Sequence, residues 1–160
     1  MNRFPLAKGF NPMKQLMTTL LLLGALSFST GSAAQQSQDF GEYVVHYNVL
    51  NTNLIPPQVA QGYGIQRSSS RALINVAVLK KVMDTPGTPV GALVTANGTN
   101  LTGQRRDIEI RKIEDPEGAI YYIGEFPVHN LETYRFNIQV AIEGEEDPLV
   151  VKFKQQFFTE

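Results

Sequence analysis

Apolar and polar side chains alternate with a period of two through most of the chain after Asp39, and this pattern constrains the fold more than any other feature. Clusters of Gly, Pro, Asn and Asp separate the alternating segments, as they commonly do between β-strands. The alternation is uninterrupted in residues 131–142, one face of which carries Tyr134, Phe136, Ile138, Val140 and Ile142. The chain after Asp39 is therefore predicted to be all-β.

The spacing of these segments predicts an immunoglobulin-like antiparallel β-sandwich of about seven strands. The expected strands are residues 40–50, 71–81, 90–96, 105–113, 119–126, 131–142 and 149–158. The segment 71–81 is apolar on both faces, which predicts a central strand. Asn97-Gly98 predicts a two-residue turn. Tyr134, near the start of its strand, predicts a tyrosine corner in which its hydroxyl bonds to the backbone of the preceding turn.

The segment 13–34 has the composition of a secretory signal peptide. Basic residues precede an apolar run at 16–28 that is too short for a comfortable membrane span, and the small residues Ser32-Ala33-Ala34 follow it. We expect a cleaved signal peptide at residues 1–34, a single β-sandwich domain at 35–160 and a periplasmic location. No second long apolar run follows, so no transmembrane segment is expected after cleavage.

Charge and cysteine content exclude several classes of function. Cleavage after Ala34 leaves eleven basic and fifteen acidic residues, a net charge of −4, so nucleic acid is not expected as a partner. The chain has no cysteine, which excludes disulfides, a thiol nucleophile and thiolate metal ligands.

The remaining chemistry-bearing side chains do not form a recognisable catalytic motif. Only two histidines, His46 and His129, follow the signal segment, and neither has other ligands at metal-site spacing. We therefore predict no metal, no other cofactor and no catalytic residue, and thus a protein that is not an enzyme. A carboxylate pair for glycoside chemistry is conceivable but less favoured, because the candidates crowd into one predicted turn as Glu143, Glu145, Glu146 and Asp147.

The best candidate for a binding site is the segment 63–71, with His46 as a possible neighbour. It places one aromatic ring and two guanidinium groups beside flexible glycines, a combination suited to a carboxylate, a phosphate or a chain terminus. The alternative interpretation is a crossover loop between the two sheets, in which Arg67 is tied to the protein itself. The candidate ligand-binding residues are His46, Tyr63, Arg67, Ser68, Arg71 and Asn75.

Three stretches of the chain resemble the exported bacterial proteins grouped as domain-of-unknown-function family 4426. They are residues 40–81, 132–140 and 152–158, and the most specific part is Val45-His-Tyr-Asn48 followed by Tyr63-Gly-Ile-Gln-Arg67-Ser68. The resemblance covers nearly the whole chain after the signal segment. It implies a periplasmic, all-β, immunoglobulin-like domain of unassigned role, and it carries over no catalytic residue.

From these observations we expect a non-enzymatic periplasmic binding domain. Its partner would be another periplasmic protein or a component of the cell envelope. One alternative is a periplasmic carrier of a small ligand or a metal that uses residues 63–71. A second alternative is an enzyme that acts through ordinary carboxylates.

Overall fold

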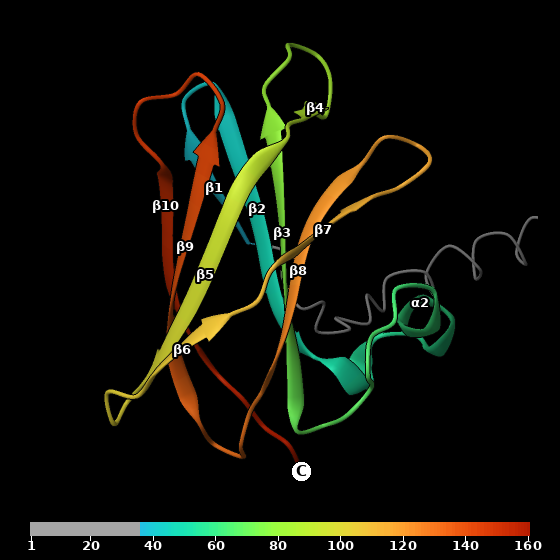
Figure 1. Cartoon of the computed structure of the whole chain (residues 1–160), viewed down its shortest axis with the longest axis vertical. Coiled ribbons are helices and arrows are strands. Elements are labelled where there is room, and N and C mark those ends of the chain that lie inside the picture. Colours follow the sequence, from blue (N-terminus) through green and yellow to red (C-terminus); the bar gives the residue numbers. More distant parts are fainter. Residues whose placement is uncertain (1–35) are drawn as a thin grey trace, which may run out of the picture. The chain divides into compact units, whose positions relative to one another are not determined.

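The strand predicted at 71–81 forms the centre of the larger of two sheets (Figure 1). The computed structural model describes residues 36–160, so the predicted signal segment lies outside the described residues. Strand β3 (Arg71–Lys80) pairs antiparallel with β2 (Tyr43–Asn51) on one side and with β8 (Ile120–Pro127) on the other. Its core-facing positions are buried, and its outward positions are buried at Leu73 and half-buried at Asn75, Ala77 and Leu79, which accounts for its almost continuous apolar sequence.

Three short strands complete the larger sheet. They are β1 (Gln36–Phe40) beside β2, β7 (Arg111–Glu114) beside β8, and β4 (Thr88–Pro89) beside β3. The smaller, four-stranded sheet has the order β10 (Leu149–Gln156), β9 (Thr133–Ile142), β5 (Ala92–Asn100) and β6 (Arg105–Ile108). All pairings are antiparallel among the described residues.

Two short helices, η2 (Thr52–Leu54) and α2 (Pro57–Gly62), connect β2 to β3. The sequence predicts at most a helical turn here, because Pro56-Pro57 excludes a central strand and suits the first turn of a helix. None of the helices within residues 36–160 is long and apolar enough to span a membrane.

The strand order confirms the predicted immunoglobulin-like sandwich. The neighbours β2-β3-β8-β7 correspond to strands A, B, E and D of that fold, and β5-β9-β10 correspond to C, F and G. There are ten strands within residues 36–160, rather than about seven, because β1 and β4 are additional and the segment 105–113 forms two strands. The core lies between the sheets and is built from inward positions such as Val45, Ile74, Val76, Phe136 and Ile138.

The predicted turn at Asn97-Gly98 is wrong, because β5 continues through it to Asn100. Gly98 pairs with Phe136 and lies against two aromatic rings, and a Cβ atom there would be 3.0 Å from the Tyr134 ring and 3.1 Å from the Phe136 ring. Glycine is therefore needed at this position for close packing and not for a turn.

The predicted strand 105–113 is also corrected, because its two halves belong to different sheets. Strand β6 pairs with β5 in the smaller sheet, and β7 pairs with β8 in the larger one. The chain crosses between the sheets over Gly124, where a Cβ atom would lie 2.6 Å from Ile108 Cγ2 and 2.7 Å from the carbonyl oxygen of Glu109. The hairpin predicted from Asp115-Pro-Glu-Gly118 is confirmed as β7 and β8.

Tyr134 is buried at the start of β9 as predicted, but among residues 36–160 its hydroxyl makes no hydrogen bond to backbone. Burial raises its pKa most strongly, and the nearby side chains of Arg106 and Glu132 also act on that pKa. The predicted backbone hydrogen bond of a tyrosine corner is thus wrong, and the side chains that act on the pKa of Tyr134 come from Arg106 in β6 and from Glu132, just before β9.

Candidate binding groove

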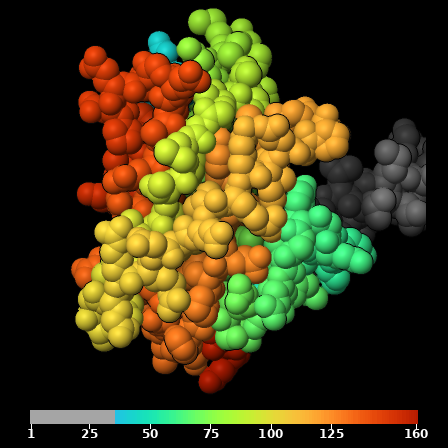
Figure 2. Space-filling model, viewed as in Figure 1, coloured from blue at the N-terminus to red at the C-terminus, as the bar shows by residue number. Residues whose placement is uncertain are grey.

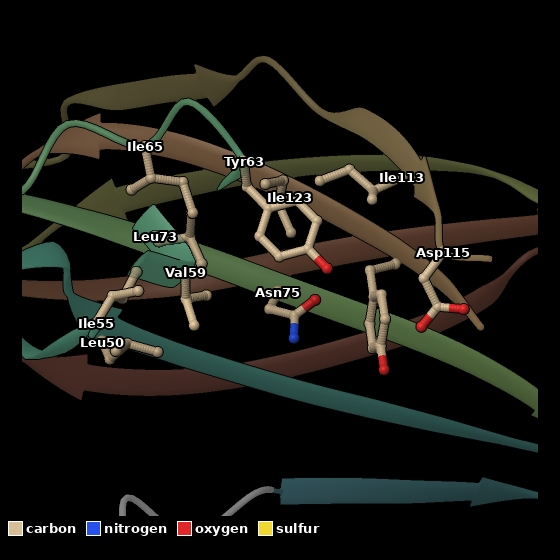
Figure 3. Close-up of a pocket in the computed structure, with 11 residues that line it drawn as sticks. Leu50, Ile55, Val59, Tyr63, Ile65, Leu73, Asn75, Ile113, Asp115 and Ile123 are labelled. Carbon is tan, nitrogen blue, oxygen red and sulfur yellow. The ribbon is translucent and has the colours of Figure 1, made fainter. Parts of the chain in front are cut away.

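The outer face of the larger sheet, which points away from the core, carries a groove with a volume of about 330 Å³ (Figure 3). We call it the outer groove. Its walls are the connection 52–66 on one side, called the lip, and the β7–β8 hairpin on the other. The lining residues are Leu50, Ile55, Val59, Tyr63, Ile65, Leu73, Asn75, Ile113, Asp115, Tyr121 and Ile123.

Apolar residues at outward positions of the strands hold the lip in place. Leu50 and Leu73 are opposite each other in β2 and β3, and Ile123 lies in β8. Ile55 and Ala60 of the lip are buried against this surface and form a second, smaller core with Leu73 and Ile123. Figure 2 shows the lip in green next to the orange hairpin. The sheet therefore buries apolar side chains on both faces. The lip covers only part of the outer face, and the uncovered part forms the groove.

Asn75 is the polar residue on the floor of the outer groove, between the aliphatic cluster at one end and Asp115 at the other (Figure 3). It stands opposite Asn48 in β2 and Ile123 in β8. Its Oδ1 atom is buried and has no hydrogen-bond partner within residues 36–160. A buried acceptor without a donor costs about 1–3 kcal/mol, so this atom is suited to a donor supplied from outside.

Tyr63 stands at the rim of the outer groove, with 38% of its surface exposed. Its carbonyl oxygen accepts a hydrogen bond from Arg111 Nη2 at 2.5 Å, which connects the lip to the hairpin across the groove. The structure thus brings Tyr63 and Asn75, two of the six residues selected from the sequence, into one site.

Thr52 anchors the base of the lip. Its side chain is fully buried, its Oγ1 accepts a hydrogen bond from the Ser68 N–H at 2.9 Å, and it can donate to the Gln66 carbonyl at 2.8 Å. Arg67 Nη2 donates to the Asn53 carbonyl at 2.7 Å. In this structure Arg67 and Ser68 tie the loop to itself, and neither lines the outer groove.

Arg71 and His46 lie outside the outer groove. Arg71 Nη2 is 3.5 Å from Glu125 Oε2, and the same carboxylate oxygen accepts a hydrogen bond from the Gln66 N–H at 3.3 Å. His46 is half-buried in β2, opposite Ser37 in β1 and Ala77 in β3. It therefore sits one outward position beyond Asn48, on the face that carries the groove.

Comparison with known proteins identifies a family and a similar solved structure. Residues 37–160 match the family model described as "Domain of unknown function (DUF4426)". The chain belongs to this family. It is also similar to the crystal structure of a DUF4426 family protein from Pseudomonas aeruginosa PAO1, with 38% sequence identity and a TM-score of 0.66 over 78% of this chain and 94% of that one. A search of curated proteins found no match.

Titratable groups are sparse around the groove of this DUF4426 member. Asp115 is the carboxylate in the lining, and its Oδ1 accepts hydrogen bonds from the N–H groups of Glu117 and Ala119 in the hairpin turn. No group of three His, Cys, Asp or Glu side chains that could hold a metal ion occurs within residues 36–160.

The sequence reasoning missed the apolar lining, especially Ile113, Tyr121 and Ile123. One signal was present, because Tyr121 and Tyr122 give the segment 119–126 large side chains on both faces, as in the central strand. A strand that is apolar on both faces needs a cover on the outside as well as on the core side.

Proposed function

We propose that this protein is an exported, non-enzymatic binding domain that takes an apolar group of a periplasmic or cell-envelope partner into the outer groove. The observation that carries the proposal is the buried Oδ1 of Asn75, which has no partner among residues 36–160 and lies on the floor of an otherwise mainly apolar cleft. Ligand sites are typically concave and apolar, with a few polar groups that fix orientation. A partner that offers one hydrogen-bond donor among apolar atoms matches this arrangement.

The state of the carboxylates supports binding over catalysis. Asp115 is engaged by two backbone N–H groups through Oδ1, which leaves it as a turn cap. The acidic turn between β9 and β10 contributes no side chain to the groove. Among its lining residues the groove offers one carboxylate and no histidine, the side chain that most often acts as a general acid or base.

A second candidate function is a carrier of a small apolar ligand. The groove volume of about 330 Å³ favours it, since that lies within the range of small-molecule sites. Native mass spectrometry of the exported protein separates the two functions. A carrier would retain a small molecule of defined mass, whereas a domain that binds a partner protein would be free of one.

The groove itself is tested with N-phenyl-1-naphthylamine, an uncharged apolar fluorescent probe. Val59 lines the groove and is 43% exposed, so Val59→Glu places a charge at the rim without disturbing the core. We expect probe affinity to fall at least about tenfold, because a carboxylate at the entrance must be desolvated. Met83→Glu is the matched control, since Met83 is 88% exposed and does not line the groove. Equal probe affinity in both variants would contradict the proposal.

A further inference from the structure

The outer face of the smaller sheet carries three cations that form no ion pair with the described residues 36–160. Arg135 of β9 is opposite Lys154 of β10, and Lys152 is opposite Asn137. These three basic side chains are exposed, and none of them forms an ion pair within residues 36–160. The described part of the chain has more acidic than basic residues, so this basic cluster is opposite in sign to its net charge.

Amide and hydroxyl side chains continue this face across β9 and β5. Asn97 is opposite Asn137, Thr95 is opposite Gln139, and Thr99 is opposite Arg135. We call the face made by these residues with Lys152 and Lys154 the polar face. The register sets the hydroxyls and amide of β5 beside the amides and Arg135 of β9, and these lie beside the two lysines of β10.

The polar face is hollowed and contains a buried acceptor. Two concavities of about 560 and 540 Å³ are lined in part by it, and Asn97 and Asn137 line both. The larger one is also lined by Asp107, which stands opposite Asn97 in β6 and is paired with Arg105 at 3.0 Å. The Oδ1 atom of Asn137 is buried and has no hydrogen-bond partner within residues 36–160. This face therefore offers a ligand a hydrogen-bond acceptor in the hollow and positive charge beside it.

We propose that the polar face binds an anionic oligosaccharide, a sugar chain that bears carboxylate or phosphate groups. The sugar hydroxyls would donate to Asn137 Oδ1 and exchange hydrogen bonds with Asn97 and Gln139, since amides and hydroxyls both donate and accept. The anionic groups would pair with Arg135, Lys152 and Lys154. A membrane surface fits less well, because a flat bilayer does not enter a hollow.

The test titrates the exported protein with three probes. They are oligogalacturonate as the carboxylated chain, pentamannosyl phosphate as the phosphorylated chain, and neutral dextran. Calorimetric binding to either anionic chain, with no binding to dextran and an affinity that weakens with added salt, is the expected result. The two anionic arms show which group the site accepts. Binding to neither of them would overturn the proposal.

Matched variants assign the binding to the polar face. Arg135→Gln with Lys154→Gln removes two cations from it, and we expect a loss of affinity of about tenfold or more. Lys80→Gln with Lys81→Gln is the control, because it removes two cations at the end of β3, where they pair with Glu42 and Asp39. Equal losses in both double variants would overturn the proposal, since they would show a response to net charge alone.

Two further measurements address the hollow and the membrane. Asn137→Leu should weaken binding several-fold while leaving the salt dependence unchanged, because it removes the acceptor and no charge. An unchanged affinity in this variant would count against the proposed pose and overturn it. Binding to phosphatidylglycerol vesicles in the absence of binding to either oligosaccharide would also overturn the proposal, in favour of a membrane surface.

Discussion

At the scale of single residues, the two sheets share one feature, a buried asparagine oxygen on the outer face. Each has an asparagine on its outer face whose Oδ1 is buried without a partner within residues 36–160, Asn75 in β3 and Asn137 in β9. Each of these atoms lies beneath a hollow. A group that folding leaves unsatisfied lowers stability, and its retention is understandable where a ligand completes it.

The first prediction follows for Asn75. Asn75→Leu should raise the free energy of unfolding by about 1–2 kcal/mol, because an apolar side chain of similar size replaces an unsatisfied acceptor. Urea denaturation measures the change. Asn51→Leu is the contrast, since Asn51 Nδ2 donates to the carbonyls of Ser69 at 2.7 Å and Phe158 at 2.8 Å, and its loss should destabilise the domain. A destabilised Asn75→Leu would show that the amide has an internal role.

Arg67 provides the second prediction. Its guanidinium is hydrogen-bonded to the Asn53 carbonyl and is exposed, so Arg67→Lys should change the free energy of unfolding by less than about 1 kcal/mol. Probe affinity at the outer groove should stay the same, because Arg67 does not line it. Thermal melting and the fluorescence titration, made on the same sample, check both expectations. A large loss of affinity at unchanged stability would restore Arg67 as a ligand-binding residue.

Glu132 makes stability depend on pH. Burial raises its pKa, but hydrogen bonds from the His129 ring, from Asn100 and from the His129 N–H outweigh this and hold the pKa below its ordinary value of 4.5. A carboxyl whose folded pKa lies below its unfolded value stabilises the fold fully above the unfolded value. That stabilisation is lost as the pH falls through the folded pKa.

The third prediction is therefore a pH-dependent difference between Glu132→Gln and the parent. At about pH 7 the variant should be less stable by about 1–2 kcal/mol, because charge-assisted hydrogen bonds are lost. This difference in stability should shrink as the pH falls below the ordinary pKa of a glutamate carboxyl. Urea unfolding over a pH series measures it, and a difference that stays constant with pH would contradict the assignment.

How far the site could be predicted depended on the kind of residue. Tyr63 is selected as an aromatic ring beside flexible glycines and Asn75 as a polar residue in an apolar strand, and they do share the groove. Arg67 and Ser68 belong to the same stretch, but their partners are Asn53 and Thr52, whose proximity follows only from the folded lip. Local sequence does not specify which guanidinium finds a backbone carbonyl.

At the scale of elements, two glycines determine how strands approach. Gly98 lets β5 pass beneath the rings of Tyr134 and Phe136, and Gly124 lets the crossing at Ile108 lie on β8. Turn statistics favoured a turn at Gly98, and the crossing was not predicted. Both outcomes depend on contacts with strands far away in the sequence, which alternation within one segment does not encode.

The fourth prediction ranks three alanine substitutions. Gly124→Ala should be the most destabilising, because its Cβ would lie 2.7 Å from the Glu109 carbonyl oxygen and force backbone to move. Gly98→Ala should cost about 1–3 kcal/mol through displaced rings. Gly62→Ala, with nothing within 4 Å, should be neutral or stabilising in α2. Midpoints of thermal unfolding give the order, and a Gly98 variant that is worse than Gly124 would contradict it.

At the scale of the whole molecule, the fold was the most predictable feature. Alternation along each strand requires a face for the core, and seven such segments at regular spacing predict two sheets that bury each other. The segment that covers the outer face of the larger sheet was harder to predict. It depends on how the connection 52–66 returns over β3, and a segment with Pro56-Pro57 has no periodic pattern to follow.

The fifth prediction concerns export. We expect the mature protein to begin at Gln35, because small residues precede it and the first strand starts at Gln36. Mass spectrometry of the intact protein recovered from the periplasm measures this end directly. A mature form that retains residues 1–34 would contradict the expected processing.

Thr52 has a consequence for how fast a partner can bind. Its buried hydroxyl joins the two ends of the lip, and Arg111 fastens the lip to the hairpin through the Tyr63 carbonyl. With both attachments made by the protein itself, the groove exists before any encounter, and no lid has to open first. Association at the outer groove is then one bimolecular step, whose observed rate rises in proportion to partner concentration without reaching a plateau.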